Sequence, residues 1–163
     1  MSATNRGGAE RLADDAYTTP GWTVHRLLDA VGHLLPGGEW LEPGAGDGAI
    51  IRAVRWYTKS QGRESIRWTA VEKRDECLAH LRGCNGKSRP KIRVCDFLTW
   101  QPPRERFAVA LGNPPFSLAR EFIERSLQLA REFIERSLQL ADAVIMMARL
   151  NFLEGETRAE WLR

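Results

Sequence analysis

Apolar positions along this chain follow two alternating periods. Between residues 21 and 34 they recur every three or four residues, which is the spacing of one face of an α-helix. After the break at Pro36-Gly37-Gly38, residues 39–42 form a short run typical of a strand. The same patterns predict further helices over 49–56, 74–82 and 117–140, and further strands over 65–73, 91–97 and 106–113 and from residue 142. Strands that alternate with helices favour an α/β fold, in which helices cover both faces of a mostly parallel sheet.

The length of 163 residues predicts one domain with a core of its own. Residues 1–14 are polar and rich in small side chains, so we expect a flexible lead-in to a single domain over 15–163. The net charge of +3 is compatible with a polyanionic partner but does not require one. No apolar run approaches the roughly 18 residues of a membrane span, so we expect no membrane partner.

The three cysteines, Cys77, Cys84 and Cys95, have neither the even count of a disulfide framework nor the paired spacing of a metal site. We therefore expect reduced thiols, no bound metal and a cytoplasmic location, where thiols stay reduced. The N-terminus has no apolar core of a signal peptide, which agrees with that location.

The segment between the first strand and the second helix is rich in glycine. Gly44, Gly46 and Gly48 allow a tight turn and the close approach of a ligand to the backbone. Together with Ala49 they satisfy the GxGxxG/A fingerprint of dinucleotide sites. From this loop alone, a nucleotide cofactor such as NAD and a turn without a ligand both stay open, although nothing else in the chain resembles a hydride-transfer site.

Acidic residues end the next two predicted strands. Glu72 ends the second strand, where an acid can bind both hydroxyls of a ribose, although it lies 28 residues after Gly44 and dinucleotide sites favour about 20. Asp96 and Phe97 end the third strand and could bind the amino group and the ring of an adenine. Each acid alone is more often a surface carboxylate. Because the carboxyl ends of parallel strands share one edge, three such groups in succession predict a ligand site there.

Four motifs in this chain together resemble one family of enzymes. In order, they are EPGAGDG at 42–48, Glu72, Asp96-Phe97 and NPPF at 113–116. The set resembles the S-adenosylmethionine-dependent amino-methyltransferases, and most of all the N6-adenine DNA methyltransferases of phages. The resemblance covers most of residues 15–155 and implies a Rossmann-like methyltransferase fold. Members usually have seven strands, so we expect this chain, with five predicted strands, to lack the last two.

The resemblance also implies which residues bind S-adenosylmethionine. Glu72 would bind the ribose hydroxyls, and Asp96 with Phe97 would hold the adenine. The methionine end would lie against the glycine loop and under residues 17–20, which resemble the segment that closes over it in this family. The residues implied at that end are Tyr17, Thr19, Pro20, Glu42, Pro43, Gly44, Ala45 and Gly46, and Asn113 would border the cofactor from the NPPF motif.

The NPPF motif would form the site of the methyl acceptor. An exocyclic amino group is a poor nucleophile because its lone pair is delocalised into the ring. The side-chain oxygen of Asn113 and the backbone carbonyl of Pro114 would accept its two hydrogens, while Pro114 and Pro115 stiffen the turn. Phe116 would stack on a base that has left its helix. The alternative is a strand-ending turn without a ligand.

We therefore expect methyl transfer to the amino group of adenine in DNA, with DNA as the partner and, for a phage protein, the host cytoplasm as the location. Two alternatives stay open. Related NPP sites serve RNA adenine or a protein glutamine, and a chain without the last strands could be an inactive cofactor-binding or nucleic-acid-binding remnant. Cytosine-C5 methylation is disfavoured, because that family needs a Pro-Cys nucleophile and no cysteine here follows a proline.

The sequence AREFIERSLQL occurs twice without a break, at 119–129 and 130–140. Eleven residues make about three helical turns, so the apolar side chains of both copies fall on nearly the same face. A crossover helix, however, returns over only one strand length, roughly 17 to 20 Å. The helix must then overhang the sheet, loop out one copy or shift the strand pairing. We expect a recent or engineered duplication rather than a coiled coil, and we expect deletion of one copy to keep or improve cofactor affinity.

Overall fold

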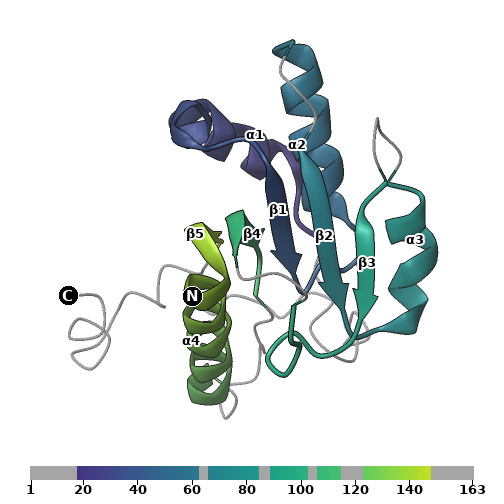
Figure 1. Ribbon diagram of the computed structural model, residues 1–163, viewed down its shortest axis with the longest axis vertical. Helices are drawn as coiled ribbons and strands as arrows, with labels where there is room; N and C mark the ends of the chain where they lie inside the picture. The colour runs from purple at the N-terminus through teal and green to yellow at the C-terminus, as the bar shows by residue number, and fades with distance from the viewer. Residues whose placement is uncertain (1–17, 63–65, 85–88, 103–105, 115–122, 148–163) are drawn as a thin grey trace, which may run out of the picture.

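The computed structural model describes residues 18–62, 66–84, 89–102, 106–114 and 123–147. In this part of the chain, helices and strands alternate as predicted (Figure 1). The elements are α1 (Gly21–Val31), the 3-10 helix η1 (Gly32–Leu34), β1 (Glu39–Pro43), α2 (Ala49–Ser60), β2 (Arg67–Glu72), the 3-10 helix η2 (Asp75–Cys77), α3 (Leu78–Arg82), β3 (Lys91–Val94), β4 (Phe107–Gly112), α4 (Ile123–Leu140) and β5 (Ala141–Met146).

All five strands belong to one parallel sheet with the order β3-β2-β1-β4-β5. The chain builds the sheet outward from β1 to β3 and then returns to the other side of β1 with β4. Figure 1 shows β1, β2 and β3 side by side, with their arrowheads at the same edge. Because the connections after β1 and β4 lead to opposite sides, a crevice forms outside the carboxyl ends of these two strands.

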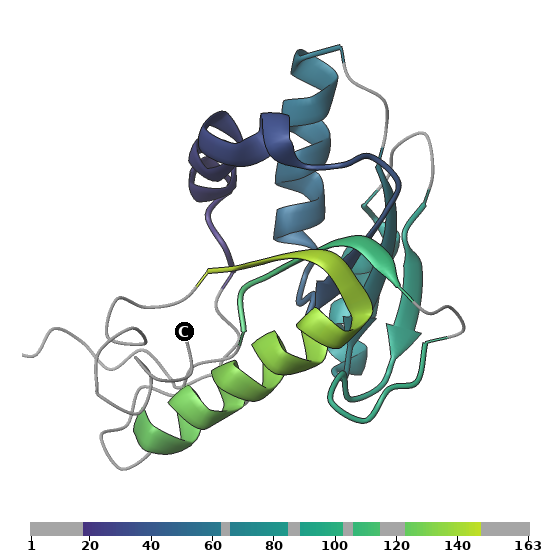
Figure 2. The same cartoon turned by 60° about the vertical axis from the view of Figure 1, so that its left-hand side comes forward.

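Helices cover both faces of the sheet, as predicted. The helices α1, α2 and α3 pack on one face and α4 packs on the other (Figures 1 and 2). Successive strand residues alternate between the two hydrophobic cores, because side chains on a strand point to opposite faces in turn. Trp40, Ala70 and Val109 belong to the core under α1–α3, and the next residue along each strand, Leu41, Val71 and Ala110, belongs to the core under α4.

The third strand is shorter than predicted, since β3 ends at Val94 and does not reach Phe97. The chain turns at Asp96 instead. Asp96 Oδ1 accepts a hydrogen bond from the Leu98 N–H at 2.8 Å, and the Asp96 carbonyl accepts one from the Trp100 N–H at 3.0 Å. An aspartate that binds the backbone two residues further on favours a turn over a strand. Asp96 and Phe97 therefore lie in the loop after β3 and not in the strand itself.

The helix that contains the repeat is one continuous element. It includes the whole second copy and residues 123–129 of the first. Its 18 residues span about 27 Å, whereas the six residues of β5 span about 20 Å. β5 begins directly after α4 and pairs with β4 from Phe107–Ala141 to Gly112–Met146. In the described residues the repeat therefore lengthens the helix and leaves strand pairing intact. The predicted start of the helix, at residue 117, lies outside them.

The segment predicted as one helix over 74–82 divides into η2 and the short α3. Among the helices of the described ranges, none is both long enough and apolar enough to cross a membrane.

Candidate functional site

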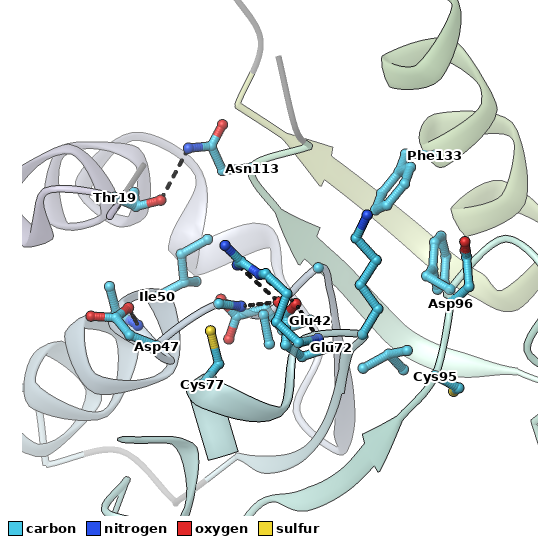
Figure 3. Close-up of a pocket in the computed structure, with 18 of the residues that line it drawn as sticks. Thr19, Glu42, Asp47, Ile50, Glu72, Cys77, Cys95, Asp96, Asn113 and Phe133 are labelled. Atoms are coloured by element: carbon cyan, nitrogen blue, oxygen red, sulfur yellow. Dashed lines mark hydrogen bonds and ion pairs between the residues drawn. The ribbon is translucent and has the colours of Figure 1, made fainter. Parts of the chain in front are cut away.

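A pocket opens at the carboxyl edge of the sheet (Figure 3). It encloses about 200 Å³ and is bordered by the connections after β1, β2, β3 and β4 and by α4. Most of the predicted site residues line it: Thr19, Glu42, Gly44, Ala45, Gly46, Glu72, Asp96, Phe97 and Asn113. Pro20, Pro43 and Pro114 lie outside this lining, and Tyr17, Pro115 and Phe116 lie outside the described residues.

The glycine loop after β1 has a shape that side chains would prevent. Gly44 and Gly48 have φ angles of 63° and 79°, which residues with a side chain rarely adopt. A Cβ atom on Gly48 would lie 2.5 Å from Cys84 Sγ, and one on Gly44 would lie 3.3 Å from the Phe133 ring. The loop backbone therefore fits closely between the end of α3 and α4, where it forms one wall of the pocket.

Glu42 is a buried acid with an unused oxygen. It is 2% exposed, near the end of β1, and lines the pocket. The Ile51 N–H in the first turn of α2 donates to its carboxyl group, but Oε2 has no hydrogen-bond partner in the described part of the chain. Burial raises the pKa of Glu42 well above its ordinary value, and the nearby Asp47 carboxylate adds to the rise. A buried carboxylate with a free lone pair beside a cavity suits a cationic or N–H-donating ligand group.

Glu72, the last residue of β2, is also buried but fully paired. Its Oε2 accepts a hydrogen bond from the Gly46 N–H at 2.6 Å, which ties the glycine loop to β2. Its Oε1 accepts from the Arg74 N–H at 3.0 Å and from Arg74 Nε at 2.8 Å. Burial raises the pKa of Glu72, but the hydrogen bonds from Arg74 and Gly46 outweigh burial and lower the pKa overall. Glu72 is therefore ionised, with Arg74 as a partner that the sequence did not predict.

The loop after β3 and the repeated helix form the other end of the pocket. Figure 3 shows Asp96 and Phe133 on one side, Thr19 and Asn113 on the other, and the two glutamates between them. Phe97 is 2% exposed, and its ring centroid lies 5.1 Å from that of Phe133 at an angle of 47°. Phe133 belongs to the second copy of the repeat. The sequence pattern predicted that Phe133 lies on the apolar face of a helix. Helical periodicity does not show which loop that face contacts.

Asn113 is the first residue after β4. Its Nδ2 donates a hydrogen bond to Thr19 Oγ1 at 3.2 Å, and its Oδ1 points away from Thr19 (Figure 3). The preceding Gly112 allows close packing, because a Cβ there would lie 3.2 Å from Pro43 Cγ and 3.3 Å from Met146 Sδ. The end of β4 is thus held tightly between β1 and β5. The structure brings Asn113 into contact with a residue 94 positions away in the sequence.

The described residues contain no group of three or more His, Cys, Asp or Glu side chains that could hold a metal ion. Cys77, Cys84 and Cys95 are free thiols, and burial raises the pKa of each. A thiol with a raised pKa is a weak nucleophile near neutral pH.

No protein-family model matches this sequence, and no curated protein matches it. Solved structures match its fold. A candidate class I S-adenosylmethionine-dependent methyltransferase from Listeria monocytogenes has a TM-score of 0.70 and 14% identity, over 93% of this chain and 52% of its own. A candidate RNA methyltransferase from Pyrococcus horikoshii has a TM-score of 0.63 and 21% identity, over 89% and 70%. A predicted N6-adenine-specific DNA methylase from Listeria monocytogenes has a TM-score of 0.55 and 14% identity, over 79% and 45%.

The fold is that of class I S-adenosylmethionine-dependent methyltransferases. This confirms the α/β fold that the sequence predicted. At 14% to 21% identity the likeness is one of fold, and this chain spans about half the length of two of the three structures. Proteins described for RNA and for DNA share the fold, so the fold does not identify the acceptor.

Proposed function

We propose that this chain binds S-adenosylmethionine in the pocket and transfers its methyl group to the exocyclic amino group of adenine in DNA. The observation that supports this most strongly is the convergence of Glu42, Glu72, Asp96 and Asn113 on one cavity. Each of them lies near or just after the carboxyl end of a different strand of one parallel sheet. The three acids suit the polar groups of the cofactor, and the asparagine suits an amino group that must donate hydrogens.

We assign each part of the cofactor to pocket residues of matching chemistry. The unused Oε2 of Glu42 suits the cationic amino group of the methionine end. Glu72 suits the ribose hydroxyls, and Asp96 with Phe97 and Phe133 suits the adenine. When bound, S-adenosylmethionine supplies an electrophilic methyl group on its sulfonium. The chain itself binds and orients the two reactants, and in such transfers orientation supplies much of the rate.

Asn113 provides the acceptor side of the proposed site. Its Oδ1 receives no hydrogen bond within the described residues, so it is available to one hydrogen of the adenine amino group. The carbonyl of Pro114 is the proposed second acceptor, in a turn that the proline ring stiffens. With both hydrogens held, the lone pair would localise on nitrogen, and the amino group would become a better nucleophile. Phe116, outside the described residues, is proposed to stack on the extruded base.

Two alternatives have support of their own. Adenine in RNA and the side-chain amide of a protein glutamine present the same two amino hydrogens, and the structures with this fold include proteins described for RNA and for DNA. The other alternative is an inactive cofactor-binding or nucleic-acid-binding remnant. Its support is Arg74, whose side chain hydrogen-bonds both oxygens of Glu72 and would compete there with the ribose of the cofactor.

Methyl transfer tests the proposal. The chain is incubated with S-adenosylmethionine that has a radioactive methyl group, and with single-stranded DNA, duplex DNA, RNA or a glutamine-containing peptide. We expect N6-methyladenine in DNA, and we expect Asn113→Ala to abolish it while cofactor binding is kept. Methylation of RNA or of the peptide, without methylation of DNA, would show that the acceptor is not DNA. Cofactor binding without transfer to any acceptor would support the inactive remnant.

A further inference from the structure

The side-chain amide of Asn113 can adopt two orientations of nearly the same shape. Its oxygen and nitrogen are similar in size, but the oxygen accepts a hydrogen bond and the nitrogen donates one. In the proposed transfer only Oδ1 can serve, because an N–H group in its place would face the hydrogens of the adenine amino group. Full activity therefore needs a partner that holds the amide nitrogen away from the methyl acceptor.

Thr19 has the position of such a partner. Asn113 Nδ2 lies 3.2 Å from Thr19 Oγ1, which is within the range of N–H···O hydrogen bonds. In this orientation the amide nitrogen faces the hydroxyl, and Oδ1 lies on the other side (Figure 3). Thr19 is 8% exposed, so water has little access to compete for this hydrogen bond.

The segment before α1 is anchored close to the end of β4. In the first turn of α1, Thr23 donates to the Pro20 carbonyl from its backbone N–H at 3.1 Å and from its hydroxyl at 2.6 Å. The Thr23 hydroxyl also lies 3.9 Å from Met147 Sδ. The Met147 N–H donates to the Gly112 carbonyl at 2.9 Å, one residue before Asn113. Both partners of the amide–hydroxyl hydrogen bond are thus fixed relative to each other.

We propose that Thr19 is a positioning residue, whose hydroxyl accepts a hydrogen bond from Asn113 Nδ2 and thereby keeps Oδ1 toward the methyl acceptor. This inference rests on the proposed role of Asn113 in methyl transfer. It gives Thr19 a role different from contact with the methionine end of the cofactor. The expected effect of losing the hydroxyl is on turnover and not on cofactor affinity.

The test compares Thr19→Val with Thr19→Ser. Valine keeps the shape of threonine and removes the hydroxyl, whereas serine keeps the hydroxyl. We expect Thr19→Val to lower kcat for DNA by about five- to tenfold, the effect of one neutral hydrogen bond, with an unchanged Kd for S-adenosylmethionine. Thr19→Ser is expected to restore kcat. Weaker cofactor binding with unchanged kcat would assign Thr19 to the cofactor and overturn the inference. If Thr19→Val does not fold, Thr19→Ala, which needs less room, takes its place.

The variant Asn113→Asp tests whether Thr19 acts by orienting the Asn113 amide or only by supporting the local structure. Both oxygens of a carboxylate accept hydrogen bonds, so the orientation of that side chain no longer matters. We expect Thr19→Val to lower kcat in the wild-type background and to have no further effect on Asn113→Asp. An equal loss in both backgrounds would overturn the inference. If Asn113→Asp is inactive, the comparison of Thr19→Val with Thr19→Ser decides.

Failure of this inference can be distinguished from failure of the proposed function. A folded wild-type chain that methylates no acceptor contradicts the proposed function, and the role of Thr19 with it. An active wild-type chain whose kcat is unchanged by Thr19→Val contradicts the role of Thr19 alone.

Discussion

Glu72 and Arg74 form an ion pair inside the pocket, with Arg74 Nε 2.8 Å from Glu72 Oε1. The two side chains are 3% and 14% exposed, so the pair is largely shielded from water. Glu72 is also the acid proposed to bind the ribose hydroxyls. Arg74 and a ribose would therefore compete for the same carboxylate oxygens, and cofactor binding requires the Arg74 side chain to move or to share them.

Removal of the Arg74 side chain should therefore have opposite effects on binding and on stability. We expect Arg74→Ala to raise the affinity for S-adenosylmethionine several-fold in calorimetry, because the ribose hydroxyls no longer meet a competitor. We expect the free energy of unfolding to fall by about 1 to 3 kcal/mol, because a buried carboxylate loses its charged partner. Arg67→Ala, at an exposed position on β2 outside the pocket lining, is the control and should change neither. Lower cofactor affinity in Arg74→Ala would show that the guanidinium binds the cofactor.

Glu42 should destabilise the fold at neutral pH. Its folded-state pKa is raised above the ordinary value of 4.5, so the folded chain holds this proton more tightly than the unfolded chain. The resulting stabilisation is fully present below pH 4.5 and is lost as the pH rises through the folded-state pKa. We expect Glu42→Gln to raise the free energy of unfolding at neutral pH, measured by chemical denaturation, and to remove this pH dependence.

Glu39 provides a matched control on the same strand. It is buried like Glu42, but it accepts hydrogen bonds from Thr69 Oγ1 at 2.8 Å and from Lys91 Nζ at 3.2 Å. Glu39→Gln should therefore lower the free energy of unfolding, by about 1 kcal/mol, because an ion pair is lost. A loss of stability at neutral pH in both variants would mean that Glu42 also has a stabilising partner.

The two copies of the repeat allow the same substitution to be compared at two positions with the same local sequence. Phe133 packs against Phe97 and near Gly44, and Phe122 occupies the same place in the first copy. We expect Phe133→Ala to lower the free energy of unfolding by about 3 kcal/mol and to weaken cofactor binding. Phe122→Ala should cost less, since the structure packs the second copy against the site. Equal losses in chemical denaturation would indicate that either copy can occupy this position.

Deletion of residues 119–129 or of 130–140 gives the same sequence. In either case the remaining copy stays joined to Ala141, and a phenylalanine keeps its distance from β5. The helix becomes about 16.5 Å shorter. We expect the affinity for S-adenosylmethionine to be kept or improved. A large loss of affinity in a folded deletion variant would show that the pocket depends on the longer helix.

The sequence predicted the parts of this site that depend on strand ends. Glu42, Glu72 and Asn113 line the pocket because the carboxyl ends of parallel strands share one edge, although their roles stay predictions. Arg74 and Phe133 were not predicted. Arg74 pairs with Glu72 only two residues away, but hydrophobic periodicity does not show where a charged side chain points. Phe133 gains its place through contact with Phe97, which is distant in the sequence, and periodicity does not encode that contact.

The end of the third strand could not be predicted from the hydrophobic pattern. Apolar side chains occur as far as Phe97 in the run 91–97, but the Asp96 side chain binds the backbone N–H of Leu98 and the strand ends at Val94. Local hydrogen bonding of this kind competes with sheet pairing, and hydrophobic pattern does not reveal which of the two dominates.

The claim that this pocket binds S-adenosylmethionine through Glu42 can be tested by calorimetric titration of the wild-type chain and of Glu42→Gln. We expect the wild-type chain to bind S-adenosylmethionine but not NAD, and Glu42→Gln to bind S-adenosylmethionine more weakly. We also expect the affinity of the wild-type chain to rise with pH as Glu42 ionises, beside Asp47, Arg52 and Glu72. Glu42→Gln should lack this rise. A folded chain that binds NAD alone, or that binds S-adenosylmethionine equally well with glutamine at position 42, would contradict the claim.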